Sequence, residues 1–338
     1  MAPVLSYAQR HEDMHLLRAL GGQRSGFYID IGAGHPVYDN VSFAFYLRGW
    51  RGITVEPNPW LDELSAAVRP RDIRVASLVG EKMGEAAYHL VEDFHGLSTT
   101  IASNAEAARR EYGKPSRAMT MPVTTLQTLC EQHGAATIDF LKIDVEGAER
   151  DVLAGGNWQR FRPRIVMLEA LSPVSMAPAW LDWEPLLIGN GYRFALFDGL
   201  NRYYAAEEHA ALGERLAAPA SMDGVTQFRN FKPAADDASH PDHALARLLA
   251  GVDMVRLPLM SDDTILERLI SGLDRADLDR PLQAADAAAA QRILFGTTAE
   301  AGSLMLPPNA TLRDLYRSAV ASEPFRAACG RISGSSAW

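Results

Sequence analysis

Cysteine is scarce in this sequence, whose 338 residues contain only Cys130 and Cys329. Two distant cysteines are too few for a disulfide framework or a cysteine-ligated zinc site, and they suit a reducing compartment. Long apolar runs are also missing, since no stretch approaches the ~18 consecutive apolar residues of a membrane-spanning helix. The N-terminal segment carries charge where a signal peptide would have an apolar core. We therefore expect a soluble, cytoplasmic protein with no transmembrane segment.

Clustered positive charge is lacking as well. Lys and Arg total 33 against 42 Asp and Glu, which gives a formal net charge of −9. A surface that binds nucleic acid needs grouped basic side chains, so we expect no nucleic-acid partner. Hydrophobic residues make up 47% of the chain, which is enough for one large core and a second, smaller unit.

Strand and helix patterns alternate along the first two thirds of the chain. Residues 138–144 form a nearly continuous apolar run, which is typical of a central parallel strand covered on both faces. Residues 73–79 are expected to form one strand, and residues 192–198 and 202–205 a terminal pair of strands. This alternation predicts a three-layer α/β sandwich.

The composition changes after about Phe231. Residues 232–243, rich in Pro, Asp, Ala and His, have the composition of a linker. Helical periodicity without a strand pattern follows, with helices expected over 262–278, 282–294 and 312–329. We expect an α/β domain over residues 1–231, a linker over 232–243, and a small helical C-terminal region over 244–338 whose role the sequence does not assign.

A turn of small residues follows the first strand of the alternating region. Its Gly32-Ala33-Gly34 lets a ligand approach the backbone closely, and Asp30 precedes it. The next strand ends at Glu56, where a carboxylate can accept hydrogen bonds from ribose hydroxyls. A dinucleotide site would have a third glycine where this chain has Val37, so a nucleoside without a diphosphate is favoured. The candidate cofactor-binding residues here are Asp30, Gly32, Ala33, Gly34, Glu56 and Asn58.

Acidic residues cluster where the apolar run of residues 138–144 ends. Asp144 and Glu146 lie at this end, and Glu169 ends the next strand, so all three are expected at one edge of the sheet. Such a carboxylate can remove the proton of a hydroxyl nucleophile. We take Asp144 as the first candidate base, then Glu146 and Glu169, with His95 as an alternative. Three carboxylates could also bind a divalent cation, although we favour a site without metal.

Several motifs, taken together and in order, resemble the FkbM family of methyltransferases. Residues 139–149 resemble the signature of that family, and the resemblance covers roughly residues 6–225. The other matching pieces are Ser6-Tyr7-Ala8-Gln9 with Glu12-Asp13, and residues 27–33, 49–53, 55–57, 96–99, 123–126 and 198–204. Gly34-His35 and Asn40-Val41-Ser42 depart from the family pattern near the expected ligand pocket.

The resemblance implies a Rossmann-like three-layer methyltransferase sandwich, with a mostly parallel seven-stranded sheet and one antiparallel strand. It implies S-adenosylmethionine as the methyl donor and a hydroxyl of a sugar, glycan or related secondary metabolite as the acceptor. It also implies that an N-terminal helix, expected over residues 6–20, closes over the site, with Gln9 and Asp13 as further candidate cofactor contacts.

Two alternatives from other classes stay open. One is a non-catalytic scaffold of a glycan-assembly complex. Its C-terminal helical region would bind the partner, or mediate a homo-oligomer. The other is a nicotinamide-dependent oxidoreductase, which the missing third glycine disfavours.

Overall fold

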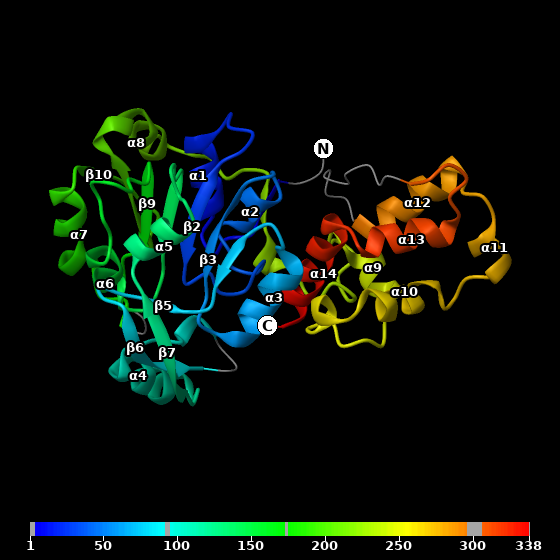
Figure 1. The fold of residues 1–338 in the computed structure, drawn as a ribbon, viewed down its shortest axis with the longest axis horizontal. Helices are drawn as coiled ribbons and strands as arrows, with labels where there is room; N and C mark the ends of the chain where they lie inside the picture. The colour runs from blue at the N-terminus through cyan, green and yellow to red at the C-terminus, as the bar shows by residue number, and fades with distance from the viewer. Residues whose placement is uncertain (1–3, 92–94, 173–174, 296–305, 338) are drawn as a thin grey trace.

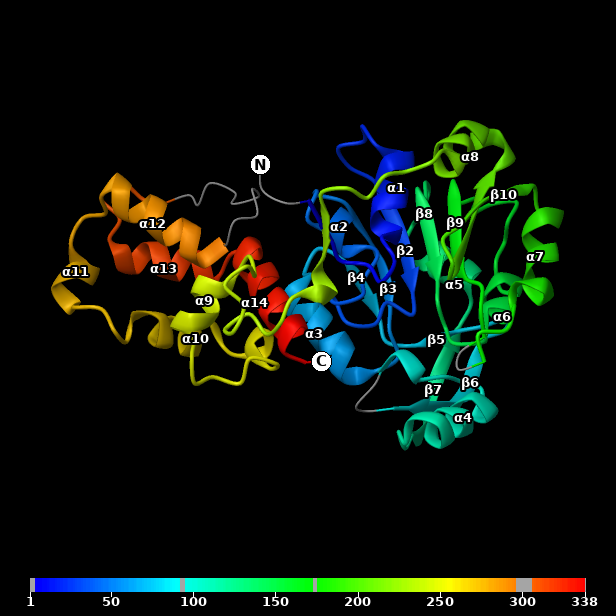
Figure 2. The ribbon, with the colours of Figure 1, turned by 180° about the vertical axis from the view of Figure 1, so that it is seen from behind.

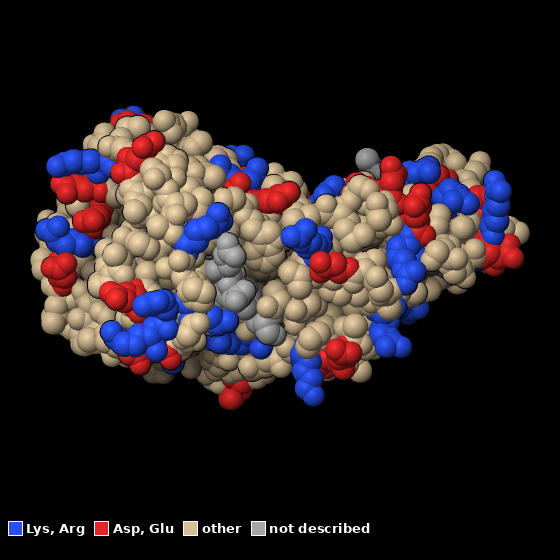
Figure 3. Space-filling model, turned by 90° about the horizontal axis from the view of Figure 1, so that it is seen from below, with Lys and Arg blue, Asp and Glu red and all other residues tan. Residues whose placement is uncertain are grey.

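The chain folds into an α/β lobe and a narrower helical lobe (Figure 1). The computed structural model describes residues 4–91, 95–172, 175–295 and 306–337. The α/β lobe contains a seven-stranded sheet, and the helical lobe contains the helices that follow residue 242. On the face seen in Figure 3, Lys and Arg are interspersed with Asp and Glu over both lobes.

The large sheet has the strand order β10-β11-β9-β8-β2-β3-β4. Its strands are β2 (Phe27–Ile31), β3 (Arg51–Val55), β4 (Ile73–Val75), β8 (Phe140–Ile143), β9 (Ile165–Glu169), β10 (Tyr192–Phe197) and β11 (Asn201–Ala206). Neighbours from β9 to β4 pair in parallel, whereas β11 is antiparallel to both β9 and β10. All four residues of β8 are buried, which confirms the expected central strand. The expected terminal strand pair is confirmed as β10 and β11.

Helices cover both faces of this sheet (Figures 1 and 2). Successive side chains of a strand point to opposite faces, and here they enter two different hydrophobic clusters. Ile29, Leu141 and Val166 pack with the helices on one face, and Tyr28, Phe140 and Ile165 pack with those on the other. The first face carries α5 (Leu126–Gln132), α6 (Glu149–Ala154) and α7 (Trp180–Gly189), and the second carries α1 (Glu12–Leu20) and α8 (Ala210–Ala217).

A smaller sheet lies below the large one in Figure 1. It has the order β5-β7-β6, with β5 (Leu78–Val79), β6 (Gly84–Leu90) and β7 (Arg117–Thr124), and it is accompanied by η1 (His95–Leu97) and α4 (Ala102–Tyr112). The expectation of one strand over residues 73–79 is therefore wrong. The Ser77 N–H donates to the Val75 carbonyl (3.1 Å), which turns the chain between β4 and β5 and sends the two strands into different sheets.

The N-terminal segment differs from the expected helix over residues 6–20. β1 (Val4–Ser6) pairs in parallel with β12 (Val225–Gln227), and α1 begins only at Glu12. The Asp13 carboxylate accepts hydrogen bonds from the Ser6 hydroxyl and the Tyr7 N–H, both at 2.7 Å. These bonds hold residues 6–11 in a turn, because the acidic side chain competes for backbone N–H groups that a helix would otherwise use.

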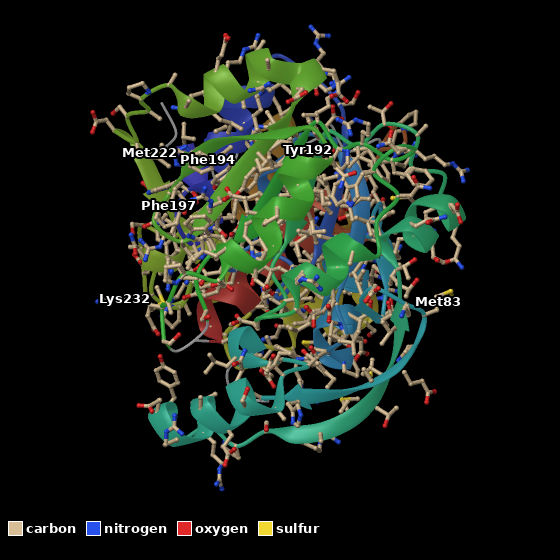
Figure 4. The ribbon with its side chains drawn as sticks, turned by 90° about the vertical axis from the view of Figure 1, so that its left-hand side faces the viewer. Met83, Tyr192, Phe194, Phe197, Met222 and Lys232 are labelled. Carbon is tan, nitrogen blue, oxygen red and sulfur yellow. The ribbon has the colours of Figure 1, made fainter. Side chains whose placement is uncertain are left out.

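The edge strand β10 exposes two aromatic rings, Phe194 and Phe197 (Figure 4). The Arg202 guanidinium lies 4.0 Å from the centroid of the Phe194 ring and 4.0 Å from that of Trp180. The register with β11 shifts between Phe194 and Leu196. Such an irregularity interrupts the straight edge that another strand would need for pairing.

The helical lobe has its own hydrophobic cluster, formed by residues from Ala234 to Ile332. Its helices are α9 (His243–Leu248), α10 (Asp262–Ile270), α11 (Arg275–Asp279), α12 (Ala284–Phe295), α13 (Leu312–Val320) and α14 (Glu323–Ser336). The single helices expected over 262–278 and 312–329 are wrong, because each range is divided. Asp274 caps α11, and Ser322 caps α14 with Pro324 in its first turn, so each of these side chains starts a new helix.

The remaining short elements are α2 (Phe43–Tyr46), α3 (Pro59–Val68), η2 (Glu207–His209), η3 (Phe228–Asn230) and η4 (Leu257–Leu259). Among the described residues, no helix combines the length and the apolar character needed to cross a bilayer. Residues 232–243, expected as a linker, include the buried His240 and Asp242. The domain boundaries at 231 and 243 stay predictions.

Candidate active site

A cavity of about 380 Å³ lies at the carboxyl ends of β2, β3, β8 and β9. The large sheet contributes Gly32, Ala33, Gly34, Glu56, Lys142, Asp144, Glu146 and Glu169 to its lining. The small sheet and its loops contribute Leu78, Val79, Tyr88, Ser98 and Thr99, and the N-terminal turn contributes Gln9 and Arg10. Strand ends of the large sheet and two flanking segments thus converge on one site, as in other open α/β sheets.

The turn after β2 needs glycine for two separate reasons. Gly32 has a φ of 71° and Gly34 a φ of 62°, which are left-handed conformations that favour glycine. A Cβ on Gly32 would also lie 1.7 Å from the carbonyl oxygen of Asp144, so only glycine fits against the end of β8. The N–H groups of Gly32 and Ala33 donate to the Val55 carbonyl at 3.0 and 3.1 Å, which fixes the turn over β3.

Glu56 lies in the cavity beside this turn. Its carboxylate accepts hydrogen bonds from the N–H groups of Gly34 and Asn58, each at 2.8 Å. Burial raises the pKa of Glu56 to about 7, and the two N–H donors oppose part of that rise. Each carboxylate oxygen can accept more than one hydrogen bond, so Glu56 can accept from a ligand hydroxyl as well.

Two of the expected cofactor contacts near the glycine turn lie outside the cavity lining. Asn58 caps α3 by accepting a hydrogen bond from the Trp60 N–H at 3.0 Å. Asp30 is buried beneath the turn, where it accepts from the Ser42 hydroxyl at 2.5 Å and lies 3.3 Å from the Lys142 ammonium. Both residues support the turn and the strand end rather than the cavity wall.

Of the two candidate cofactor contacts near the N-terminus, Gln9 lies at the cavity and Asp13 does not. Gln9 lines the cavity, and its carbonyl accepts a hydrogen bond from the Gln227 side chain at 2.9 Å. Asp13 is fully buried and outside the lining, because its carboxylate is used to hold the N-terminal turn. Burial raises the pKa of Asp13 to about 6, against the opposing effect of its hydrogen bonds.

The three candidate catalytic carboxylates come together. Asp144, Glu146 and Glu169 each place a carboxylate oxygen within 4.8 Å of the others. Burial, followed by repulsion from neighbouring carboxylates, raises the pKa of both Glu146 and Glu169 well above the ordinary value. Hard oxygen ligands in such a group are also those that a divalent cation prefers.

Lys142 supplies positive charge to this group. Its ammonium donates to the Gly32 carbonyl at 2.5 Å and lies 3.5 Å from the Asp144 carboxylate. Asp144 is therefore the carboxylate of the three with a cation beside it. Lys142 was not among the candidate site residues predicted from the sequence, although its place in β8, two residues before Asp144, was a usable signal.

Several other residues of the cavity lining could not be predicted from the local sequence pattern. Arg10, Ser77, Tyr88 and Met176 lie on turns or on the small sheet, which folds against the large one only in the tertiary structure. The Ser77 hydroxyl is buried and has no hydrogen-bond partner among the described residues. The side chain of His95, the alternative base, lies outside the described part of the chain.

The sequence of the α/β domain also matches a known protein family. Residues 30–194 match the family model described as the Methyltransferase FkbM domain. The α/β domain belongs to the FkbM methyltransferase family. No curated protein and no solved structure matches this chain significantly.

The matched part of the FkbM domain begins at Asp30 and ends at Phe194 in β10. It contains the glycine turn, Glu56 and all three carboxylates of the cavity. The N-terminal turn with Gln9 and the helical lobe lie outside it. The core of the candidate site therefore lies inside the methyltransferase FkbM domain.

Proposed function

We propose that the chain is an S-adenosylmethionine-dependent O-methyltransferase that acts on a hydroxyl of a sugar, glycan or related secondary metabolite. One observation carries the proposal: a single cavity holds both the glycine turn with Glu56 and the carboxylates Asp144, Glu146 and Glu169. A donor bound at the first group and a hydroxyl bound at the second would be neighbours. We also class the domain as a Rossmann-like methyltransferase sandwich, on the support of its strand order and antiparallel β11.

The residues around the turn fit the donor chemically. Gly32 and Gly34 leave the backbone open to close approach, and Glu56 can accept from ribose hydroxyls. The buried Ser77 hydroxyl lacks a partner among the described residues and can bond a polar atom of the ligand. When bound, S-adenosylmethionine supplies an electrophilic methyl group on a sulfonium.

The carboxylates fit a hydroxyl acceptor. A sugar hydroxyl is a poor nucleophile unless a base accepts its proton as the new bond forms. Burial favours the protonated forms of Glu146 and Glu169, whereas Asp144 lies beside the Lys142 ammonium. We therefore assign proton acceptance to Asp144, with Glu146 and Glu169 orienting the acceptor, and we propose that the site works without a metal.

The mouth of the cavity offers apolar surface for a sugar-like ligand. Tyr112 and Met176 line the cavity and are 55% and 51% exposed. An exposed aromatic ring gives the apolar face of a sugar a surface to pack against. The mixed charge in Figure 3 also supports a small-molecule or glycan acceptor over nucleic acid. The buried free thiols Cys130 and Cys329 support our proposal of a cytoplasmic location.

A thermal-shift comparison tests the proposed donor. A ligand that binds only the native state raises the melting temperature, so we expect a rise with S-adenosylmethionine and S-adenosylhomocysteine and none with NAD. A rise with NAD alone would support an oxidoreductase, and no rise with any of them would support a scaffold. Calorimetry of Glu56→Ala should show S-adenosylhomocysteine binding weakened by about 1–3 kcal/mol.

A further inference from the structure

The C-terminal helix α14 packs against α3 and the loop that follows the glycine turn. α14 lies beside α3 in both views of the ribbon (Figures 1 and 2). Ala327 of α14 shares a hydrophobic cluster with Val37 and Val68 of the α/β lobe. The helix thus reaches residues 33–39, which we call the 33–39 loop and which overlap the end of the glycine turn.

Two glycines permit this close approach. A Cβ on Gly330 would lie 2.6 Å from Val68 Cγ1 and 3.0 Å from Val37 Cγ2. A Cβ on Gly334, one helical turn later, would lie 3.1 Å from His35 Cε1 and 3.3 Å from Tyr38 Cβ. Glycine inside a helix costs roughly 1 kcal/mol relative to alanine. The close contact of α14 with Val37, His35 and Tyr38 gives a physical reason for a glycine at both positions of the helix.

The 33–39 loop has one side on α14 and the other on the cavity. His35 Nδ1 accepts the N–H groups of Val37 and Tyr38 at 3.1 and 3.0 Å, so the position of the ring sets the curvature of the loop. Gly34, Tyr38 and Asp39 of the same loop line the cavity. A shift of the His35 ring would therefore change the cavity wall.

The helix itself is firmly anchored in the helical lobe. The Arg331 guanidinium makes two hydrogen bonds of 2.7 Å to the Asp242 carboxylate, and both side chains are buried. The Ser335 hydroxyl accepts the Ala234 N–H at 3.2 Å. α14 cannot slide or rotate without breaking buried polar contacts, whose loss is costly.

We propose that α14 positions the 33–39 loop for ligand binding, so that donor affinity depends on the helical lobe. None of the described residues that line the cavity comes from α14. The helix would act only through the loop, and Gly330 and Gly334 are positioning residues. The inference rests on the proposed function, because it takes the ligand at this loop to be the methyl donor.

Gly334→Val and Gly334→Ala test this in the full-length protein, with Ala328→Val as the matched control. Ala328 is buried in α14 but packs within the helical lobe's own cluster. We expect S-adenosylhomocysteine binding by calorimetry to weaken at least tenfold in Gly334→Val and about threefold in Gly334→Ala. The control should stay within twofold of wild type, even if urea unfolding shows it to be less stable.

Hydrogen exchange of the peptide covering residues 33–39 gives a readout that needs no ligand. The amides of Val37 and Tyr38 should exchange at least tenfold faster in Gly334→Val than in wild type, and at the wild-type rate in Ala328→Val. If the wild type fails to bind S-adenosylhomocysteine, the proposed donor is wrong, while exchange still tests the link to the loop. Wild-type exchange and affinity in Gly334→Ala would overturn the inference, whether or not Gly334→Val folds.

Discussion

At the end of α3, the buried Arg69 guanidinium bonds the Asp72 carboxylate at 2.8 Å and the Tyr28 hydroxyl at 3.0 Å. Arg331 and Asp242 form an equally balanced buried pair in the helical lobe. At the carboxyl edge of the sheet the balance is different, since Asp144, Glu146 and Glu169 face Lys142, which also lies 3.3 Å from Asp30. Carboxyl groups that outnumber their cationic partners repel one another when ionised, and groups whose pKa is shifted in this way are typical of sites that act on a ligand. The comparison separates groups that hold the fold from groups kept for chemistry.

The largest effect should come from the unbalanced region. We expect Asp144→Asn to lower turnover by ~10²–10⁴-fold, because an amide cannot accept the hydroxyl proton. Affinity for S-adenosylhomocysteine should change by no more than a few-fold, since Glu56 and the glycine turn bind the donor. Steady-state kinetics on a panel of hydroxylated sugar acceptors, combined with calorimetry, measures both quantities.

The same assay distinguishes a base from a metal ligand. Wild-type activity should survive EDTA if the site works without a metal. Loss in EDTA that Mg²⁺ restores would instead make Asp144, Glu146 and Glu169 cation ligands. Near-normal turnover of Asp144→Asn without metal would shift the role of base to Glu146 or Glu169.

Disrupting a balanced pair should cost stability instead. Asp242→Asn leaves the Arg331 guanidinium buried without its anion, so we expect the free energy of unfolding to fall by ~3–5 kcal/mol in urea titrations. The double variant Asp242→Leu with Arg331→Met removes both charges and should recover most of the loss. Equal destabilisation in the double variant would show that packing, rather than the unpaired charge, sets the cost.

The acidic site should also set a pH dependence of stability. The folded-state pKa of Glu169 is raised above the ordinary 4.5, first by burial and then by the Asp144 charge. The contribution of Glu169 to stability is therefore greatest at pH values below the ordinary pKa of 4.5. This contribution is lost as the pH rises through the raised folded-state pKa. Glu169→Gln should melt at a higher temperature than wild type at pH 8–9, and the gap should narrow toward pH 5. Glu85→Gln, at an exposed position, should show no such trend.

The smallest effect should come from the buried hydroxyl of Ser77. Ser77→Ala removes a buried group without a partner among the described residues, so the ligand-free protein should be as stable as wild type or slightly more so. Binding of S-adenosylhomocysteine should weaken by about 0.5–1.5 kcal/mol if this hydroxyl bonds the donor. Unchanged binding in calorimetry would remove Ser77 from the donor site.

The order of strands along the chain made part of this site predictable. Each parallel strand ends at the same edge, so the sequence alone leads one to expect Gly32, Glu56, Asp144 and Glu169 together. The central strand before Asp144 was predictable because a strand buried on both faces is a continuous apolar run. The terminal pair of strands was predictable because a short turn separates two strand-like segments.

Side-chain direction was not predictable. Asn58 follows Glu56 closely, yet it caps α3, because a free helix N-terminus nearby offers an unpaired N–H. Asp30 points beneath the turn toward Ser42 and Lys142, which come from other parts of the chain. The division of residues 73–79 between two sheets likewise depends on pairing with β3 and β7, about which the segment itself carries no information.

The parallel pairing of β1 with β12 has a consequence for the order of events during synthesis. Gln9, at the cavity, accepts a hydrogen bond from Gln227, 218 positions later in the chain. A nascent chain in which β2, β3, β8 and β9 have emerged already contains the glycine turn and the three carboxylates, but β12, which pairs with the strand of its first residues, is still to be translated. The part of the cavity wall formed by Gln9 is thus fixed late, after β12 has left the ribosome, so a partly translated chain would have an incomplete site.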